Sequence, residues 1–188
     1  METSMHTLRA SLALGAAIVL ATPAAIAQRV TEVGNAPMFP SKDIIANAVN
    51  SKEHTTLVAA VKAAGLVETL QGPGPFTVFA PTDAAFAKLP DGTVASLLEP
   101  EAKSKLQAIL TYHVVPGRID AATMKKLIAD DGGVSTTIKT VQGDNLTLAK
   151  NGYNYVVKDK SGSLARISTY DVYQSNGVIH VIESVLLP

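Results

Sequence analysis

The chain has 188 residues, of which 47% are hydrophobic, and its 16 basic side chains equal its 16 acidic ones. A balanced charge without a basic run gives no electrostatic support for nucleic acid or acidic lipid as a partner. Cysteine is absent, which excludes disulfides, thiolate metal sites and thiol nucleophiles. A fold built from this sequence therefore depends on its hydrophobic core.

The first 27 residues have the pattern of an export signal. His6 and Arg9 precede an apolar run at 10–21, and Ala25-Ile26-Ala27 supplies a small-x-small cleavage pattern. The run is too short and too rich in alanine to be a membrane anchor. We expect a signal peptide at 1–27 and a mature form that begins at Gln28, does not span a membrane, and is periplasmic or secreted.

The mature chain has the size of one domain. Residues 28–40, with two prolines and a glycine, are interpreted as a lead-in arm rather than a packed element, and 41–188 as the domain. Ser41 is expected to cap a first helix. A second helix is expected at 55–64, with Gly65 as its stop.

The next elements are a strand and then more helices. The strand that begins at Phe76 should stop at Pro81, because proline cannot continue a ladder, and Thr82 should cap the helix that follows. The further helices are expected at 82–88, 93–98, 101–111 and, capped by Asp120, up to 128.

After Gly132-Gly133 the pattern changes to strands separated by turn residues. In the last strand, Val178, His180 and Ile182 should lie on one face, with Ile179 and Val181 on the other. Helices first and strands later predict an α+β domain. The strand candidates are 134–139, 146–150, 153–159, 165–169 and 178–183.

Three blocks of sequence, in this order, resemble the fasciclin domain family. They are Phe-Thr-Val-Phe-Ala-Pro-Thr-Asp-Ala-Ala-Phe at 76–86, Tyr-His-Val-Val-Pro-Gly at 112–117 and Asn-Gly-Val-Ile-His-Val-Ile-Glu-Ser-Val-Leu-Leu-Pro at 176–188. The resemblance covers about 43–188 and is closest to single-domain, secreted bacterial members. It implies one compact β-core wrapped by a helical layer. It also implies a non-enzymatic role in adhesion or protein interaction outside the cytoplasm, with a cell-surface or envelope protein or an extracellular matrix component as partner.

The resemblance also marks four candidate binding residues. Tyr112 and His113 match the Tyr-His element of the family. His113 has two interpretations: a recognition or pH-sensitive residue, or a hydrogen-bonded imidazole inside the core. The apolar neighbours favour the core interpretation, with Tyr112 partly exposed at the rim as the contact residue. Asp171 and Val172 align with the Asp-Ile element associated with integrin-mediated adhesion in animal members, with Val in place of Ile.

The sequence contains no pattern of residues that indicates catalysis. It lacks zinc-binding, nucleophile-elbow and phosphate-binding motifs, so we expect no enzyme, metal or cofactor. His180 should be structural and His54, which precedes a helix, exposed. Asp83 lies in a first helical turn, where a carboxylate is stabilised by the helix dipole.

The alternative function is the carriage of an apolar small ligand such as a carotenoid or lipid, because certain algal proteins with this domain bind carotenoids. A helical layer over a β-core could leave an apolar groove. Its candidate walls are Met124, Leu127, Ile128, Tyr153 and Tyr155.

Overall fold

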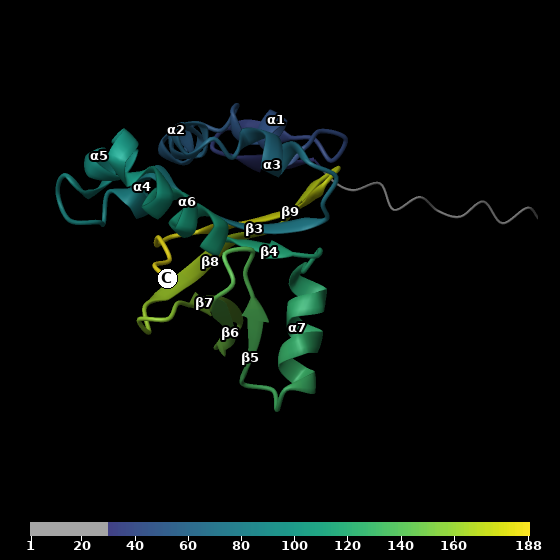
Figure 1. Cartoon of the computed structure of the whole chain (residues 1–188). Coiled ribbons are helices and arrows are strands. Elements are labelled where there is room, and N and C mark those ends of the chain that lie inside the picture. The colour runs from purple at the N-terminus through teal and green to yellow at the C-terminus, as the bar shows by residue number, and fades with distance from the viewer. Residues whose placement is uncertain (1–29) are drawn as a thin grey trace, which may run out of the picture.

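The computed structural model describes residues 30–188 (Figure 1). The expected signal peptide and the cleavage point before Gln28 lie outside the described residues. Seven helices and nine strands are present in the described part. The helices are α1 (Ile44–Ala48), α2 (Thr55–Ala64), α3 (Val67–Gln71), α4 (Asp83–Phe86), α5 (Thr93–Leu98), α6 (Lys103–Tyr112) and α7 (Ala121–Asp130), with a 3-10 turn at Pro100–Ala102.

Most of the strands form one seven-stranded sheet in the order β4-β3-β9-β8-β7-β6-β5. At its centre β3 runs parallel to β9, and every other neighbouring pair is antiparallel. The strands are β3 (Phe76–Pro81), β4 (Val114–Pro116), β5 (Ser135–Lys139), β6 (Asn145–Asn151), β7 (Asn154–Lys158), β8 (Leu164–Gln174) and β9 (Gly177–Ile182).

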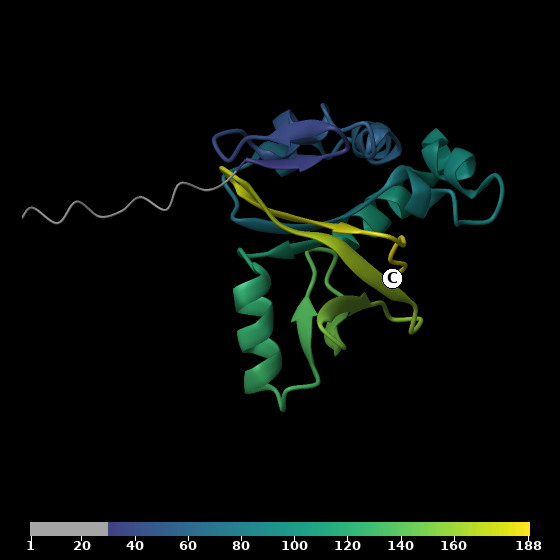
Figure 2. The ribbon, with the colours of Figure 1, turned by 180° about the vertical axis from the view of Figure 1, so that it is seen from behind.

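The sheet curls until its two edges approach each other. The backbone N–H of Val141, just after β5, donates to the carbonyl of Val114 in β4 at 2.7 Å. Helices α1 to α6 cover one side of the central strands, and α7 lies with the curled part of the sheet on the other side (Figures 1 and 2). The α+β class and the β-core with a helical layer are therefore confirmed.

The two faces of β9 contribute to two separate cores, as its alternating pattern predicts. Ile179 and Val181 pack under the helical layer with Val78 of β3. Ile182 packs on the other face with Phe79, in the core that also contains the side chains of α7. Because successive side chains of β9 point to opposite faces and each face is covered by a core, the strand is buried along its whole length.

Residues 30–40 correct the expectation of an unpacked lead-in arm. They form a small antiparallel hairpin of β1 (Thr31–Val33) and β2 (Ala36–Met38). Val33 and Met38 are buried in the helical-side core, and two residues with positive φ, Gly34 and Asn35, make the turn. The arm interpretation was wrong because each strand has only three residues, which is too short for an alternation of buried and exposed residues to stand out in the sequence.

The first helix also begins later than expected. Asp43, not Ser41, is its N-cap, and the Asp43 carboxylate accepts from the Ala46 N–H at 2.7 Å. The caps expected at Thr82 and Asp120 and the stop at Gly65, which has φ +71°, are confirmed.

Candidate functional site

Tyr112 is the last residue of α6, and its side chain is completely buried. Its hydroxyl donates to the carbonyl of Asn145 and accepts from the N–H of Lys160, both at 3.0 Å. Burial raises the pKa of this hydroxyl. The expectation of a partly exposed contact residue was therefore wrong, because the ring fills the core beside α7 and its polar end finds backbone partners there.

His113, the C-cap of α6, is 3% exposed. Its Nδ1–H donates to the Ile109 carbonyl at 2.8 Å, and its Nε2 accepts from the Leu186 N–H at 3.0 Å. Burial lowers the pKa of the ring to about 4. With both nitrogens occupied and the neutral form favoured, the core interpretation of His113 is confirmed.

Asp171 and Val172 lie at an irregularity in β8, where its pairing with β9 shifts. Val172 is buried under the helical layer and is not available to a partner. Asp171 is half-buried and has φ +57°, which is uncommon for a residue other than glycine. Its Oδ1 accepts from the Ala121 N–H at 2.7 Å, in the first turn of α7. Of the four candidate binding residues, Asp171 alone reaches the surface.

Three other half-buried side chains lie close to this part of β8, namely those of Arg118, Asp120 and Tyr173. The Arg118 guanidinium lies 6.0 Å from the centre of the Tyr173 ring and donates to the Gln174 carbonyl. The Tyr173 hydroxyl donates to Oδ2 of Asp120 at 3.2 Å. Burial, followed by the charges of Asp171 and Asp120, raises the pKa of Tyr173 to about 12.

We call these four residues, Arg118, Asp120, Asp171 and Tyr173, the Arg118 surface. The loop before α7 supplies the first two and β8 supplies the others, from about fifty positions further along the chain. Sequence reasoning found Asp171 through the resemblance and Asp120 only as a helix cap. No local pattern marks Arg118 or Tyr173, because they are far apart in the sequence and meet only in the folded chain.

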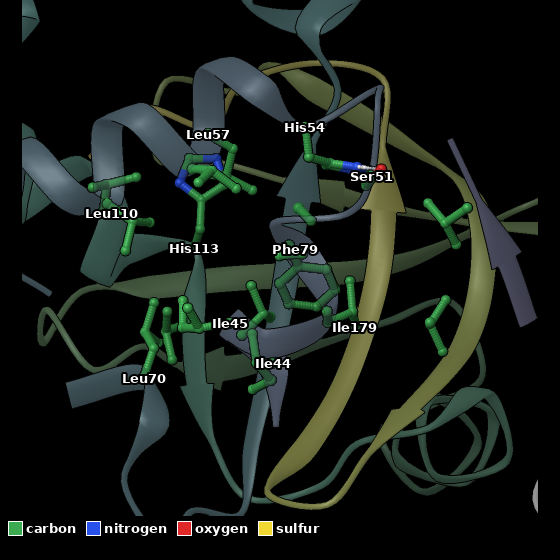
Figure 3. Close-up of a pocket in the computed structure, with 18 of the residues that line it drawn as sticks. Ile44, Ile45, Ser51, His54, Leu57, Leu70, Phe79, Leu110, His113 and Ile179 are labelled. Carbon is green, nitrogen blue, oxygen red and sulfur yellow. Dashed lines mark hydrogen bonds between the residues drawn. The ribbon is translucent and has the colours of Figure 1, made fainter. Parts of the chain in front are cut away.

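A second candidate site is an apolar cavity between the helices α1 to α3 and the sheet (Figure 3). Its volume is about 50 Å³, which is room for about four water-sized groups. Its walls are mainly aliphatic side chains from both layers, including Ile44, Ile45, Leu57, Leu70 and Ile179.

The walls proposed from the sequence for an apolar groove do not form this cavity. Met124 and Ile128 are buried in the core beside α7, with Leu127 and Tyr155 packed against it. Tyr153 is fully exposed at the β6–β7 turn. The groove was misplaced because the apolar face of α7 packs tightly on the curled sheet.

His54 lines the cavity and corrects another expectation, since it is 4% exposed rather than at the surface. Its Nδ1 lies 2.8 Å from the Ser51 hydroxyl (Figure 3). Its Nε2 is the one buried side-chain nitrogen or oxygen without a hydrogen-bond partner in the described part. Burial lowers the pKa of the ring against smaller raising effects, the first from the Ala80 carbonyl.

His180 and Asp83 have structural roles. Nε2 of His180 bonds to the Ile119 carbonyl at 2.8 Å, and Nδ1 accepts from the Asp171 N–H. Asp83 accepts from the N–H groups of Thr55 and Thr56 and from the Thr55 hydroxyl, so it caps α2 while standing in the first turn of α4. Burial alone would raise the pKa of Asp83, but these hydrogen bonds together have the larger effect, so the pKa is below its ordinary value.

No cluster of three or more histidine, aspartate or glutamate residues within 30–188 could hold a metal ion. Over the same residues, none of the helices has the length and apolar character required to cross a membrane.

Comparisons with known proteins agree with this architecture. The model of the fasciclin domain matches residues 52–188. Protein sll1483 of Synechocystis is 42% identical over 194 residues, covering 100% of this chain and 99% of that protein. Cell surface glycolipoprotein MPB83 of Mycobacterium bovis is 32% identical over 167 residues, covering 86% of this chain and 68% of that protein.

A solved structure with the same fold is a FAS1 domain pair from the insect cell adhesion molecule Fasciclin I. It superposes with a TM-score of 0.69 at 19% identity, over 78% of this chain and 51% of that one. The family match and the relatives, added to the sheet and helical layer described above, show that the chain belongs to the fasciclin domain family.

Proposed function

We propose that this protein is a non-enzymatic adhesion or protein-interaction domain that acts outside the cytoplasm, in the periplasm or after secretion. Its partner is a cell-surface or envelope protein or an extracellular matrix component. Membership of the fasciclin family supports this proposal, as does the cell-surface location stated in the name of the mycobacterial relative. The contacts of the buried histidines and of Asp83 are accounted for by structural roles, so nothing points to catalysis by these residues.

The observation that carries the proposal is the Arg118 surface. Arginine and tyrosine are enriched among the residues that dominate binding energy at protein interfaces. Here the Arg118 guanidinium lies over the Tyr173 ring, 6.0 Å from its centre, and the pair is bordered by the carboxylates of Asp120 and Asp171. A planar cation and a ring with fixed orientation lose little conformational freedom on binding, so the surface is suited to a polar protein partner.

The test is an adhesion assay of the purified mature protein on the envelope fraction of its own host. Arg118→Ala should reduce retention at least about tenfold, as a residue that dominates an interface does. Tyr153→Ser is the matched control, because it removes a fully exposed aromatic ring at the β6–β7 turn, and it should bind normally. Full binding by Arg118→Ala, or loss of binding by Tyr153→Ser alone, would assign the contact elsewhere.

Export is part of this proposal and has its own test. The expected mature N-terminus is Gln28, after the Ala25-Ile26-Ala27 pattern. Intact-mass analysis of the protein recovered outside the cytoplasm measures the cleavage point directly. An exported form that retains Met1 would contradict the signal peptide.

A second candidate function is the carriage of an apolar small ligand such as a carotenoid or lipid. The observation in its favour is the cavity of about 50 Å³ under α1 to α3, with the unpaired Nε2 of His54 in its wall. This volume is room for a group of a few heavy atoms, such as one end of a longer chain. Organic extraction of the protein purified from its host, followed by mass spectrometry, would reveal such a ligand.

A further inference from the structure

Two of the asparagines in the chain are followed by glycine, and the structure places them in opposite surroundings. Asn151 and Gly152 are exposed at the turn between β6 and β7, whereas Asn176 and Gly177 are buried where β9 begins. The Asn-Gly sequence is reactive, because glycine has no Cβ to keep its backbone nitrogen away from the preceding side chain. The two sites are therefore a matched pair, with the same chemistry in different environments.

The exposed site leaves the reacting groups free. Asn151 pairs with Asn154, so the turn consists of Gly152 and Tyr153, and Gly152 has φ +62°, as in hairpin turns that place glycine first. The Gly152 N–H has no backbone hydrogen-bond partner within residues 30–188, and no atom lies near the place that a Gly152 Cβ would take. The turn must open briefly for this nitrogen to reach the Asn151 side chain, and an exposed strand end opens more easily than a buried junction.

The buried site holds its asparagine side chain by both ends. Asn176 is 7% exposed. Its Oδ1 accepts from the Ile44 N–H at 3.0 Å, and its Nδ2 donates to the carbonyls of Leu70 and Gly72 at 2.8 and 3.0 Å. The Gly177 nitrogen can approach the Asn176 side chain only after these three hydrogen bonds break.

The reaction that this contrast controls takes place within the chain. The Gly152 nitrogen forms a bond to Cγ of Asn151 and loses its hydrogen to solvent, while the bond from Cγ to Nδ2 breaks and Nδ2 leaves as ammonia. Water then adds to either carbonyl carbon of the resulting five-membered succinimide and opens the ring. One opening gives aspartate and the other gives isoaspartate, in which the backbone passes through the side-chain carbons. Water is the co-reactant, and no group changes its oxidation state.

We propose that Asn151 is a site of spontaneous deamidation in the folded protein, whereas the fold protects Asn176 from the same reaction. Either product places a carboxylate next to Lys150, and the isoaspartate product also adds one carbon to the backbone at the β6–β7 turn. The modified hairpin therefore differs in charge and in length from the original one. The inference goes beyond the adhesion proposal and does not depend on it, since this turn and the Arg118 surface share no residue.

The test follows both asparagines in one sample of the purified mature protein, kept folded for several weeks at neutral and at mildly alkaline pH. Trypsin releases them in separate peptides, 151–158 and 167–188, and mass spectrometry measures the gain that accompanies replacement of NH₂ by OH. We expect this gain at Asn151 to accumulate at least about tenfold faster than at Asn176, because the reaction at Asn176 must first break three buried hydrogen bonds. The rate at Asn151 should rise with pH, since the nitrogen attacks after losing its hydrogen.

Two controls separate the effect of the fold from that of the sequence. In guanidinium chloride the unfolded protein should react at similar rates at both asparagines, because the contrast belongs to the folded state. Asn151→Gln keeps the amide but would have to form a larger ring, so it should remove the mass gain from the first peptide, which also contains Asn154. Fragmentation by electron transfer should find both aspartate and isoaspartate at position 151.

The proposal would be overturned if Asn151 stayed unmodified in the folded protein while it reacted in the unfolded one, because the hairpin would then protect it. Equal rates at Asn151 and Asn176 in the folded protein would also overturn it. A product that is aspartate alone would exclude the succinimide and overturn the proposed step. Arg118→Ala should give the same peptide masses as the wild-type protein, which separates this test from that of adhesion.

Discussion

His113 and Leu186 are joined by a hydrogen bond in which the backbone N–H of Leu186 donates to Nε2 of His113 at 3.0 Å. Since Nδ1 of the same ring is held by Ile109, one side chain connects the end of α6 to the last residues of the chain. Leu186 itself is buried in the core beside α7. His113 therefore holds the C-terminal segment in place at the end of α6.

The first prediction concerns the stability that this connection provides. His113→Ala leaves the Leu186 N–H and the Ile109 carbonyl without their partner, so it should lower the free energy of unfolding by about 1–3 kcal/mol. Denaturant midpoints measure the change, with Tyr153→Ser as a surface control. A fully stable His113→Ala that no longer adheres would instead make this residue a recognition site.

The second prediction is a loss of stability in mild acid. Burial lowers the pKa of His54, His113 and His180, that of His113 to about 4, whereas a histidine in the unfolded chain titrates near 6.5. Below pH 6.5 the unfolded state therefore binds more protons than the folded state, and the free energy of unfolding falls as the pH drops toward 4. Above pH 6.5 this contribution is fully present.

Urea midpoints measured at intervals from pH 7.5 to 4.5 test this expectation. The decrease should be steeper than in His113→Ala, which lacks one of the three groups that take up a proton on unfolding. Stability that stays constant or increases on acidification would show that these rings are already charged, or not buried, in the folded state.

The sequence predicted the elements whose signals are local. The cap at Thr82, the αL stop at Gly65 and the alternation along β9 each depend on a few adjacent residues, and each is found. Tyr112 was placed wrongly because its partners, Asn145 and Lys160, are 33 and 48 positions away. No local pattern distinguishes a tyrosine whose hydroxyl finds a backbone partner from one that reaches solvent.

The same limit applies to the candidate sites. His54 precedes a helix, a position that is usually exposed, but Ser51 turns the ring toward the cavity under α1 to α3. Arg118 and Tyr173 are about fifty positions apart and meet only in the folded chain, close to the point where the pairing of β8 shifts. The positions of these side chains depend on contacts between segments far apart in the sequence. Hydrophobic periodicity, which is a local pattern, does not predict such contacts.

The third prediction separates the three phenylalanines of the 76–86 block by burial. Phe79 and Phe86 are buried, in the two different cores, whereas Phe76 is only partly buried. Phe79→Ala and Phe86→Ala should each cost about 3–5 kcal/mol, because large-to-small changes in a core leave a cavity. Phe76→Ala should cost clearly less. Tyr153→Ala, which removes a fully exposed ring, should change the free energy of unfolding by no more than about 0.5 kcal/mol. Unchanged denaturant midpoints in all three phenylalanine variants would contradict this placement.

The last prediction concerns Asn176 and Gly177, where the helical layer is attached to the sheet. Oδ1 of Asn176 accepts from the Ile44 N–H at 3.0 Å, and its Nδ2 donates to the carbonyls of Leu70 and Gly72. One buried side chain therefore holds the start of α1 and the end of α3. Asn176→Ala should cost at least about 2 kcal/mol, because several buried backbone groups lose their partner together.

Gly177 is required for a different reason, namely close approach. A Cβ at this position would lie 2.3 Å from the carbonyl oxygen of Phe76, in the backbone of the neighbouring strand. Backbone cannot move aside as a flexible side chain can, so Gly177→Ala should separate β3 from β9 and cost about 2 kcal/mol or more. Asn154→Ala, at an exposed strand position, is the matched control for both variants. If denaturant midpoints of Asn176→Ala and Gly177→Ala equal that of the control, this junction does not hold the two layers together.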